Sequence, residues 1–111
     1  MVDGNSHYAD FAFRLVMDNS WLFIEDDDAQ RAIGNAAKYW RWMTLNKIAV
    51  PVHLVHIIGP GLDSHKKLAA FICEQANKDH RQFKYYQILT ENWEDKGWKH
   101  SFVATIGSIV K

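Results

Sequence analysis

Apolar and polar residues alternate in two short stretches near the N-terminus, at residues 10–16 and 21–27. A period of two residues is typical of β-strands that bury one face. Asp18 and Asn19 lie between the two stretches, and both residue types tolerate the backbone angles of a tight turn. The pattern therefore predicts a β-hairpin. The side chains of its predicted core face are Phe11, Phe13, Leu15, Leu22 and Ile24.

A turn centred on Asp18 and Asn19 also sets which residues lie opposite one another. Asp10 is then opposite Asp27, and Ala12 is opposite Glu25. Because side chains alternate along a strand, Asp10, Glu25 and Asp27 share the polar face of the hairpin. Asp10 and Glu25 become diagonal neighbours, close enough to share a cation.

Residues 29–45 follow a different period, because apolar side chains recur every three or four positions. This spacing is typical of an amphipathic helix. Asp27 or Asp28 can cap it, since a carboxylate accepts hydrogen bonds from the first N–H groups of a helix. The stripe predicted to be buried consists of Ala29, Ile33, Ala36, Trp40 and Met43.

The rest of the chain alternates between strand and helix patterns. Residues 51–58 are nearly all apolar and are followed by Gly59-Pro60-Gly61, which predicts a central strand covered on both faces. Ser64 can cap a second helix that continues to about residue 77. The predicted buried stripe of this helix is Leu68, Ala69, Ile72, Cys73 and Ala76. A strand at residues 83–90, a polar loop at 91–100 and a last strand at 100–111 complete the prediction.

This order of elements predicts a single domain, residues 1–111, of the α/β class, with three layers built on a mixed sheet. The composition agrees, because 48% of the residues are hydrophobic, enough for a core without disulfides. Cys73 is the only cysteine, so we expect a buried thiol in a reducing compartment. We find no secretion signal and no membrane-length apolar run, and therefore expect a cytoplasmic protein that does not bind membranes.

Four consecutive acids, Glu25 to Asp28, stand where the hairpin ends and the first helix begins. Carboxylates crowded at the end of a buried strand repel one another and resist desolvation. Three explanations fit them: a helix cap, a cation site, or solvated surface.

The hairpin has a further feature, the pair Ala9-Asp10 followed after fourteen residues by Glu25-Asp26-Asp27. With the helix and apolar strand that come next, this arrangement resembles the PD-(D/E)XK phosphodiesterase superfamily, which has the restriction-endonuclease-like fold. The resemblance implies that Asp10 and Glu25 bind Mg²⁺ or Mn²⁺, with Asp27 as a third ligand or a helix cap. It also implies a metal-dependent nuclease that acts on DNA or RNA.

The chain departs from the family pattern at two motif positions. Ala9 stands where the family usually has Pro, and Asp27 stands where it has Lys. Lys38, on the following helix, is a candidate for the missing amine, which makes the candidate catalytic set Asp10, Glu25, Asp27 and Lys38. The alternative function is a non-catalytic module on the same fold that binds nucleic acid or protein.

Basic residues gather on the first helix and just beyond it, while the net charge of the whole chain is zero. A nucleic acid would therefore have to be met by a local patch. The candidate phosphate contacts are Arg31, Lys38, Arg41 and Lys47; a solvated helix face explains the same pattern. His53 and His56 point to opposite faces of their strand, so they are expected at the edge of the core and cannot chelate one ion.

The last expectation is a homodimer. Trp42 lies about 200° around the helix from Trp40, on a side with polar neighbours, so its ring would need a cover. Trp93 and Trp98 in the loop 91–100 have no assigned core face either. Exposed aromatic rings favour a protein interface, and the competing explanation is that the loop folds back over Trp42.

Overall fold

The computed structural model describes residues 10–110; Ala9 and Lys111, which the sequence assigns to a motif and to a last strand, lie outside the described residues. The elements in chain order are β1 (Phe11–Arg14), β2 (Trp21–Asp27), α1 (Ala29–Asn46), β3 (Val52–Ile58), α2 (Asp63–Asp79), β4 (Phe83–Leu89) and α3 (Gly97–Val110). No helix within residues 10–110 has both the length and the apolar character needed to cross a membrane.

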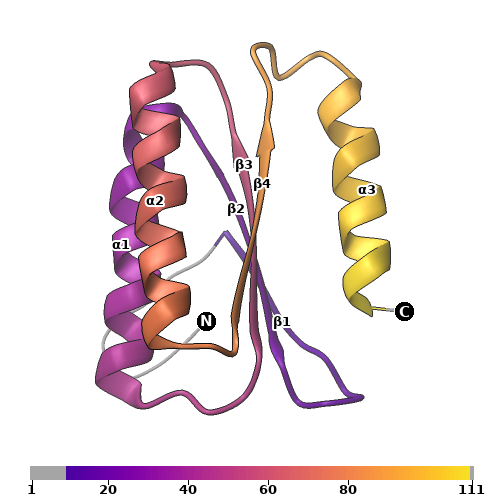
Figure 1. Cartoon of the computed structure of the whole chain (residues 1–111). Helices are drawn as coiled ribbons and strands as arrows, with labels where there is room; N and C mark the ends of the chain where they lie inside the picture. The colour runs from indigo at the N-terminus through magenta and orange to yellow at the C-terminus, as the bar shows by residue number, and fades with distance from the viewer. Residues whose placement is uncertain (1–9, 111) are drawn as a thin grey trace.

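The four strands form one mixed sheet in the order β1-β2-β3-β4. β1 is antiparallel to β2, whereas β2, β3 and β4 are parallel to one another. Helices α1 and α2 lie together on one face of the sheet, and α3 lies on the other (Figure 1). The predicted three-layer α/β class with a mixed sheet is thus confirmed.

The hairpin forms as expected, but its register differs from the predicted one. Arg14 lies opposite Trp21 and Phe11 opposite Ile24, so β1 is shifted by two residues relative to β2. The connection is longer than a two-residue turn: the Leu15 N–H donates to the Ser20 carbonyl at 2.9 Å. Continued by one residue, this register places Asp10 beside Glu25, not Asp27. An even shift leaves every side chain on its predicted face.

The face under α1 and α2 holds the larger core. Phe23 is fully buried, and its ring centroid lies 5.2 Å from those of both Tyr39 and Trp42. Trp42 is only 2% exposed, so the prediction that it lies at the surface is wrong. The alternative, in which the loop 91–100 covers Trp42, is wrong as well, because the ring packs in the core under α1 and α2. Trp40, predicted as core, is half-buried and donates from Nε1 to Asp79 at 2.9 Å. The helix is buried by both the sheet and α2, so its apolar stripe is broader than one row of residues predicts.

Helix α2 begins without the predicted serine cap. Leu62 is the N-cap residue, and its side chain makes no capping hydrogen bond. Leu68, predicted to be buried, is 43% exposed. Cys73 is fully buried as expected, and burial raises the pKa of its thiol to about 12.

The opposite face has a smaller core under α3, where the sequence predicts a last strand. That prediction is wrong, because the apolar residues there follow a helical spacing: Trp98, Phe102, Ile106 and Ile109 pack against the sheet. Helix α3 contacts β3 and β4. Phe11 and Phe13 were predicted as core but lie beyond this cover, and they are 59% and 49% exposed.

The turn after β3 packs tightly against the start of α1. Gly61 has a φ of +153°, and a Cβ there would lie 2.5 Å from the Cβ of Ala29. The ring of Trp93 covers Gly59 just as closely and meets the ring of Trp98 at 5.7 Å. Both of these rings are half-buried against the α3 face of the sheet. The aromatic surface that motivated a dimer is thus largely covered within one chain.

Candidate functional site

An acidic pocket of about 450 Å³ opens between the hairpin and α1. Strand β2 contributes its last three side chains, β1 is preceded by Asp10, and α1 contributes residues from its first three turns. The pocket is lined by Asp10, Glu25, Asp26, Asp27, Arg31, Gly34, Asn35 and Lys38. Of the residues predicted for the site, Asp10, Glu25, Asp27, Arg31 and Lys38 are therefore brought together.

Glu25 lies at the inner wall of the pocket and is 2% exposed. Its Oε2 accepts a hydrogen bond from the Tyr39 hydroxyl at 2.7 Å and lies 3.9 Å from Lys38 Nζ. Burial, reinforced by the charges of Asp10 and Asp27, raises the pKa of Glu25 to about 7, although Tyr39 and Lys38 oppose the shift. This carboxyl group therefore changes its charge near neutral pH.

Asp27 faces the same side of the sheet but is held by protein groups. Its Oδ2 accepts hydrogen bonds from Asn35 at 2.7 Å and from His56 Nε2 at 2.8 Å. Burial alone would raise the pKa of Asp27, but these hydrogen bonds outweigh it and the pKa lies below its ordinary value. Asp28, not Asp27, caps α1, because its Oδ1 accepts from the Arg31 N–H at 2.8 Å.

His56 connects Asp27 to a chain of buried polar groups under α2. Its Nδ1 lies 2.9 Å from the hydroxyl of Tyr85, and Gln87 Nε2 donates to the same hydroxyl at 2.9 Å. The hydroxyl can in turn donate to Nδ1, which leaves Nε2 to donate to Asp27. Such a satisfied network rigidifies the inner wall of the pocket.

The sequence did not identify His56 as part of this site. His53 and His56 do point to opposite faces, as predicted, and His53 Nδ1 lies 3.2 Å from the Tyr86 hydroxyl on the α3 side. His56 is fully buried, and the parallel register places it directly beside Glu25 and diagonal to Asp27. The spacing along one strand carries no information on that register, so the signal was not in the sequence pattern.

Asp10 and Asp26 meet at the outer rim of the pocket. The Asp26 N–H donates to Asp10 Oδ2 at 2.9 Å. The adjacent carboxyl group of Asp10 is the largest cause of a raised pKa at Asp26, followed by burial. Two adjacent carboxylates repel each other, so a cation beside them would be favourable.

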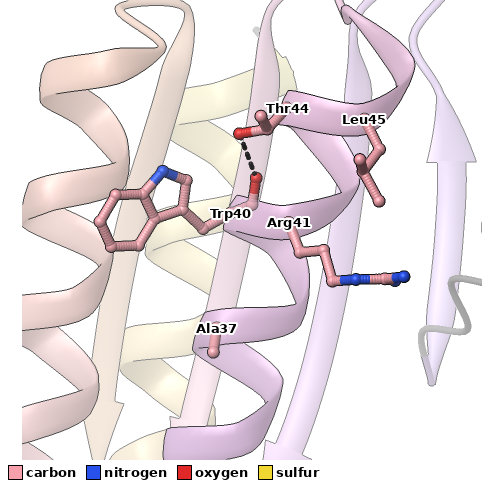
Figure 2. Close-up of a pocket in the computed structure, with 5 residues that line it drawn as sticks. All are labelled: Ala37, Trp40, Arg41, Thr44 and Leu45. Atoms are coloured by element: carbon pink, nitrogen blue, oxygen red, sulfur yellow. Dashed lines mark hydrogen bonds between the residues drawn. The ribbon is translucent and has the colours of Figure 1, made fainter.

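The four basic residues predicted as a phosphate patch divide into two groups. Arg31 and Lys38 line the acidic pocket. Arg41 lies one turn beyond and lines a separate groove with Trp40 and Leu45 (Figure 2). Figure 2 shows that Trp40 and Arg41 extend to opposite sides of α1. Lys47 is the C-cap residue of α1, with a φ of 50°, and it does not line the pocket.

Within residues 10–110, no group of three or more His, Cys, Asp and Glu side chains is arranged to hold a metal ion. Mg²⁺ is commonly held by one or two carboxylates together with water and substrate oxygens. Asp10 and Glu25 fit this smaller requirement, because their hard oxygen donors line one pocket. Asp27 fits it less well, since its Oδ2 already accepts two hydrogen bonds.

The fold and the pocket together define the class of protein. It is an α/β protein with a mixed four-stranded sheet and a carboxylate-rich pocket between its hairpin and first helix. No protein-family model, curated protein or solved structure matches this chain.

Proposed function

We propose that the acidic pocket binds a divalent cation, Mg²⁺ or Mn²⁺, and that the protein is a metal-dependent nuclease acting on nucleic acid phosphodiesters. The observation that carries the proposal is that Asp10, just before β1, and Glu25, on the antiparallel β2, line one pocket with Lys38. Carboxylate oxygens attract a hard cation, and a nearby ammonium group attracts phosphate.

The order of elements supports the proposal as well. An acid before β1, three acids at the end of β2, then a helix and a parallel strand resemble the arrangement of the PD-(D/E)XK superfamily. A restriction-endonuclease-like arrangement of the sheet is accordingly part of the proposal.

Five residues of the pocket each have a part in the proposed function. Asp10 and Glu25 hold the cation, which when bound supplies Lewis-acid stabilisation of the phosphate charge. Lys38 is on α1, with its Nζ 3.9 Å from Glu25 Oε2, and it orients the phosphodiester. The exposed Arg31 contacts a flanking phosphate. The contact between Asp27 and His56 fixes the end of β2, so that Glu25 on that strand keeps its position.

Cation binding can be measured by calorimetric titration of Mg²⁺ and Mn²⁺ at pH 7. Because the pKa of Glu25 is about 7, we expect binding to release a fraction of a proton, visible as a heat that depends on the buffer. Asp10→Asn and Glu25→Gln should each weaken binding about tenfold or more. Glu74→Gln, at an exposed acid on α2, is the matched control and should bind as the wild type does.

Cleavage is measured with plasmid and single-stranded DNA and with RNA in the same buffers. We expect cleavage that requires the cation and that Asp10→Asn abolishes while Glu74→Gln retains it. Cleavage that survives Asp10→Asn, or no cation binding at about 10 mM, would exclude the proposal.

A second function is favoured by one specific observation. Asp27 stands at the position of the family's lysine, so the motif amine is missing. Its carboxylate is held in place by Asn35 and His56. On this alternative the protein is a non-catalytic module that binds nucleic acid or an acidic protein through Arg31, Lys38, Arg41 and Lys47.

The alternative predicts DNA or RNA binding without cleavage. Affinity should fall steeply between about 50 and 200 mM salt, because phosphate contacts release counterions. Replacing Arg31 and Lys38 by Gln should reduce the salt slope by about one unit for each residue. Affinity that is insensitive to salt would contradict a contact driven by phosphate.

A further inference from the structure

Strand β1 is the edge of the sheet, and within residues 10–110 no strand pairs with its outer side. Edge strands are usually protected by Lys, Pro, a bulge or a cover, because their backbone groups can pair with another chain. The sequence of β1, Phe-Ala-Phe-Arg, has neither Lys nor Pro. This edge is therefore suited to pairing.

The direction of the outer backbone groups follows from one hydrogen bond. The Leu15 N–H donates to Ser20 on the β2 side, and in an antiparallel pair the bonded positions alternate. Phe11 and Phe13 thus direct their backbone groups toward β2. Ala12 and Arg14, and Asp10 just before the strand, direct theirs outward.

A large apolar surface surrounds this edge on the α3 side of the sheet. Two grooves lie between the hairpin and α3, and both are lined by Arg14, Leu15 and Val110. The strongly exposed apolar side chains in and beside them are Phe11, Phe13, Val16, Met17, Val103 and Val110. A concentration of exposed apolar side chains of this kind is typical of a protein interface.

We propose that the outer edge of β1 pairs in antiparallel fashion with β1 of a second copy of this chain, so that the two sheets join into one of eight strands. The two-fold axis passes beside Ala12, which lies opposite its own symmetry mate. Asp10 then lies opposite Arg14 of the second copy, and Phe11 lies opposite Phe13 of the second copy, each pair occurring twice.

A second copy fits this edge because the strand is complementary to itself. The register aligns all three outward positions of one copy with the outward positions of the other, as antiparallel hydrogen bonding requires. It also sets an acid opposite a base at both ends, and opposite charges across two strands are favourable.

This pairing does not depend on metal binding or nuclease activity, but it has a consequence for the acidic pocket. Asp10 lines that pocket. Arg14 of the second copy would therefore add a positive charge at the rim of the pocket, beside those of Arg31 and Lys38 from the first copy.

The test is the mass in solution, measured by sedimentation equilibrium over about 1 to 100 µM, the range of weak to moderate interfaces. The wild type should have twice the chain mass of 12.9 kDa at the upper concentrations. Asp10→Arg and Arg14→Asp each set like charges opposite one another and should weaken the dimer about tenfold or more. The double variant restores opposite charges and should restore the dimer.

Two controls distinguish this surface from any other. Arg41→Asp makes the same charge change on the exposed face of α1 and should leave the mass unchanged. Ala12→Pro removes an outward N–H that makes no bond to β2, so it should give a folded monomer with an unchanged circular dichroism spectrum. A monomeric wild type, a mass that rises beyond two chains, or a double variant no better than the single ones would overturn the proposal.

Discussion

The two faces of the sheet differ in how completely they are covered. Under α1 and α2 the core is continuous, and Phe23, Tyr39 and Leu54 have no exposed surface. Under α3 the core within residues 10–110 has four buried residues, all of them on the sheet, and none of the residues of α3 is fully buried. Helices α1 and α2 thus cover most of their face of the sheet, whereas α3 covers the opposite face only in part.

The sheet is thus held mainly from one side. The face under α1 and α2 also holds a network of polar side chains that includes Glu25, His56 and Tyr85. Its hydrogen bonds need rigid surroundings. The α3 face leaves β1 and the turn of the hairpin largely exposed, and the apolar surface beside β1 remains there. The site depends on the first face, and the proposed pairing depends on the second.

The largest loss of stability is expected at a phenylalanine under α1 and α2, and it can be compared with that at a phenylalanine on α3. Phe23→Ala should lower the free energy of unfolding by about 3–5 kcal/mol, because it leaves a cavity among three aromatic rings. Phe102→Ala on α3 should cost only about 1 kcal/mol, since that ring is half-buried. Urea unfolding of both variants measures the difference, and equal losses would contradict the comparison.

The second prediction concerns the titration of Glu25. Its pKa of about 7 in the folded protein exceeds the ordinary value of 4.5, so the folded state binds the proton more tightly. The contribution of Glu25 to stability is therefore greatest below pH 4.5 and falls as the pH rises to 7, by about 3 kcal/mol. Glu25→Gln should remove this slope.

The measurement is urea unfolding from pH 4.5 to 8 in EDTA, with Glu74→Gln as the control that keeps the slope. Asp27 acts in the opposite sense at lower pH: its pKa is lowered, so its contribution is lost as the pH falls below 3.8. A Glu25→Gln variant with the pH dependence of the wild type would show that Glu25 is not the titrating group.

The smallest effect comes from two glycines with open surroundings. A Cβ at Gly34 in α1 or at Gly107 in α3 would meet no atom within 4 Å. Gly34→Ala should raise the free energy of unfolding by about 0.5–1 kcal/mol, because alanine is the better helix former. If α3 opens before the rest of the domain unfolds, Gly107→Ala will slow hydrogen exchange in α3 but change global stability less. Identical global gains would indicate that α3 unfolds together with the core.

Much of the fold could be predicted from the sequence because local patterns carry it. The period-two stretches gave the hairpin, the three-four spacing gave α1, and the apolar run before Gly59 gave β3. The end of the chain was misread, because the β-branched residues after Phe102 suggest a strand while the apolar spacing from Trp98 is helical. Here periodicity was the better guide than β-propensity.

The site was predicted only in part, for reasons that lie in long-range contacts. Asp10, Glu25 and Lys38 do line one pocket, since the face of a strand follows from its alternation. His56 was missed because its contact with Asp27 depends on the register of two parallel strands that are joined by a whole helix. Trp42 was misplaced because α1 is buried on two sides.

The alternation and spacing of side chains are set along the chain, and they are enough to predict most strands and helices and the face on which the acids lie. The tertiary structure alone decided the strand register, the side on which α3 packs, and which carboxylate receives a histidine and which a tyrosine. The physical reason is that backbone preferences and side-chain periods act over a few residues, whereas burial and buried hydrogen bonds join residues far apart in the chain.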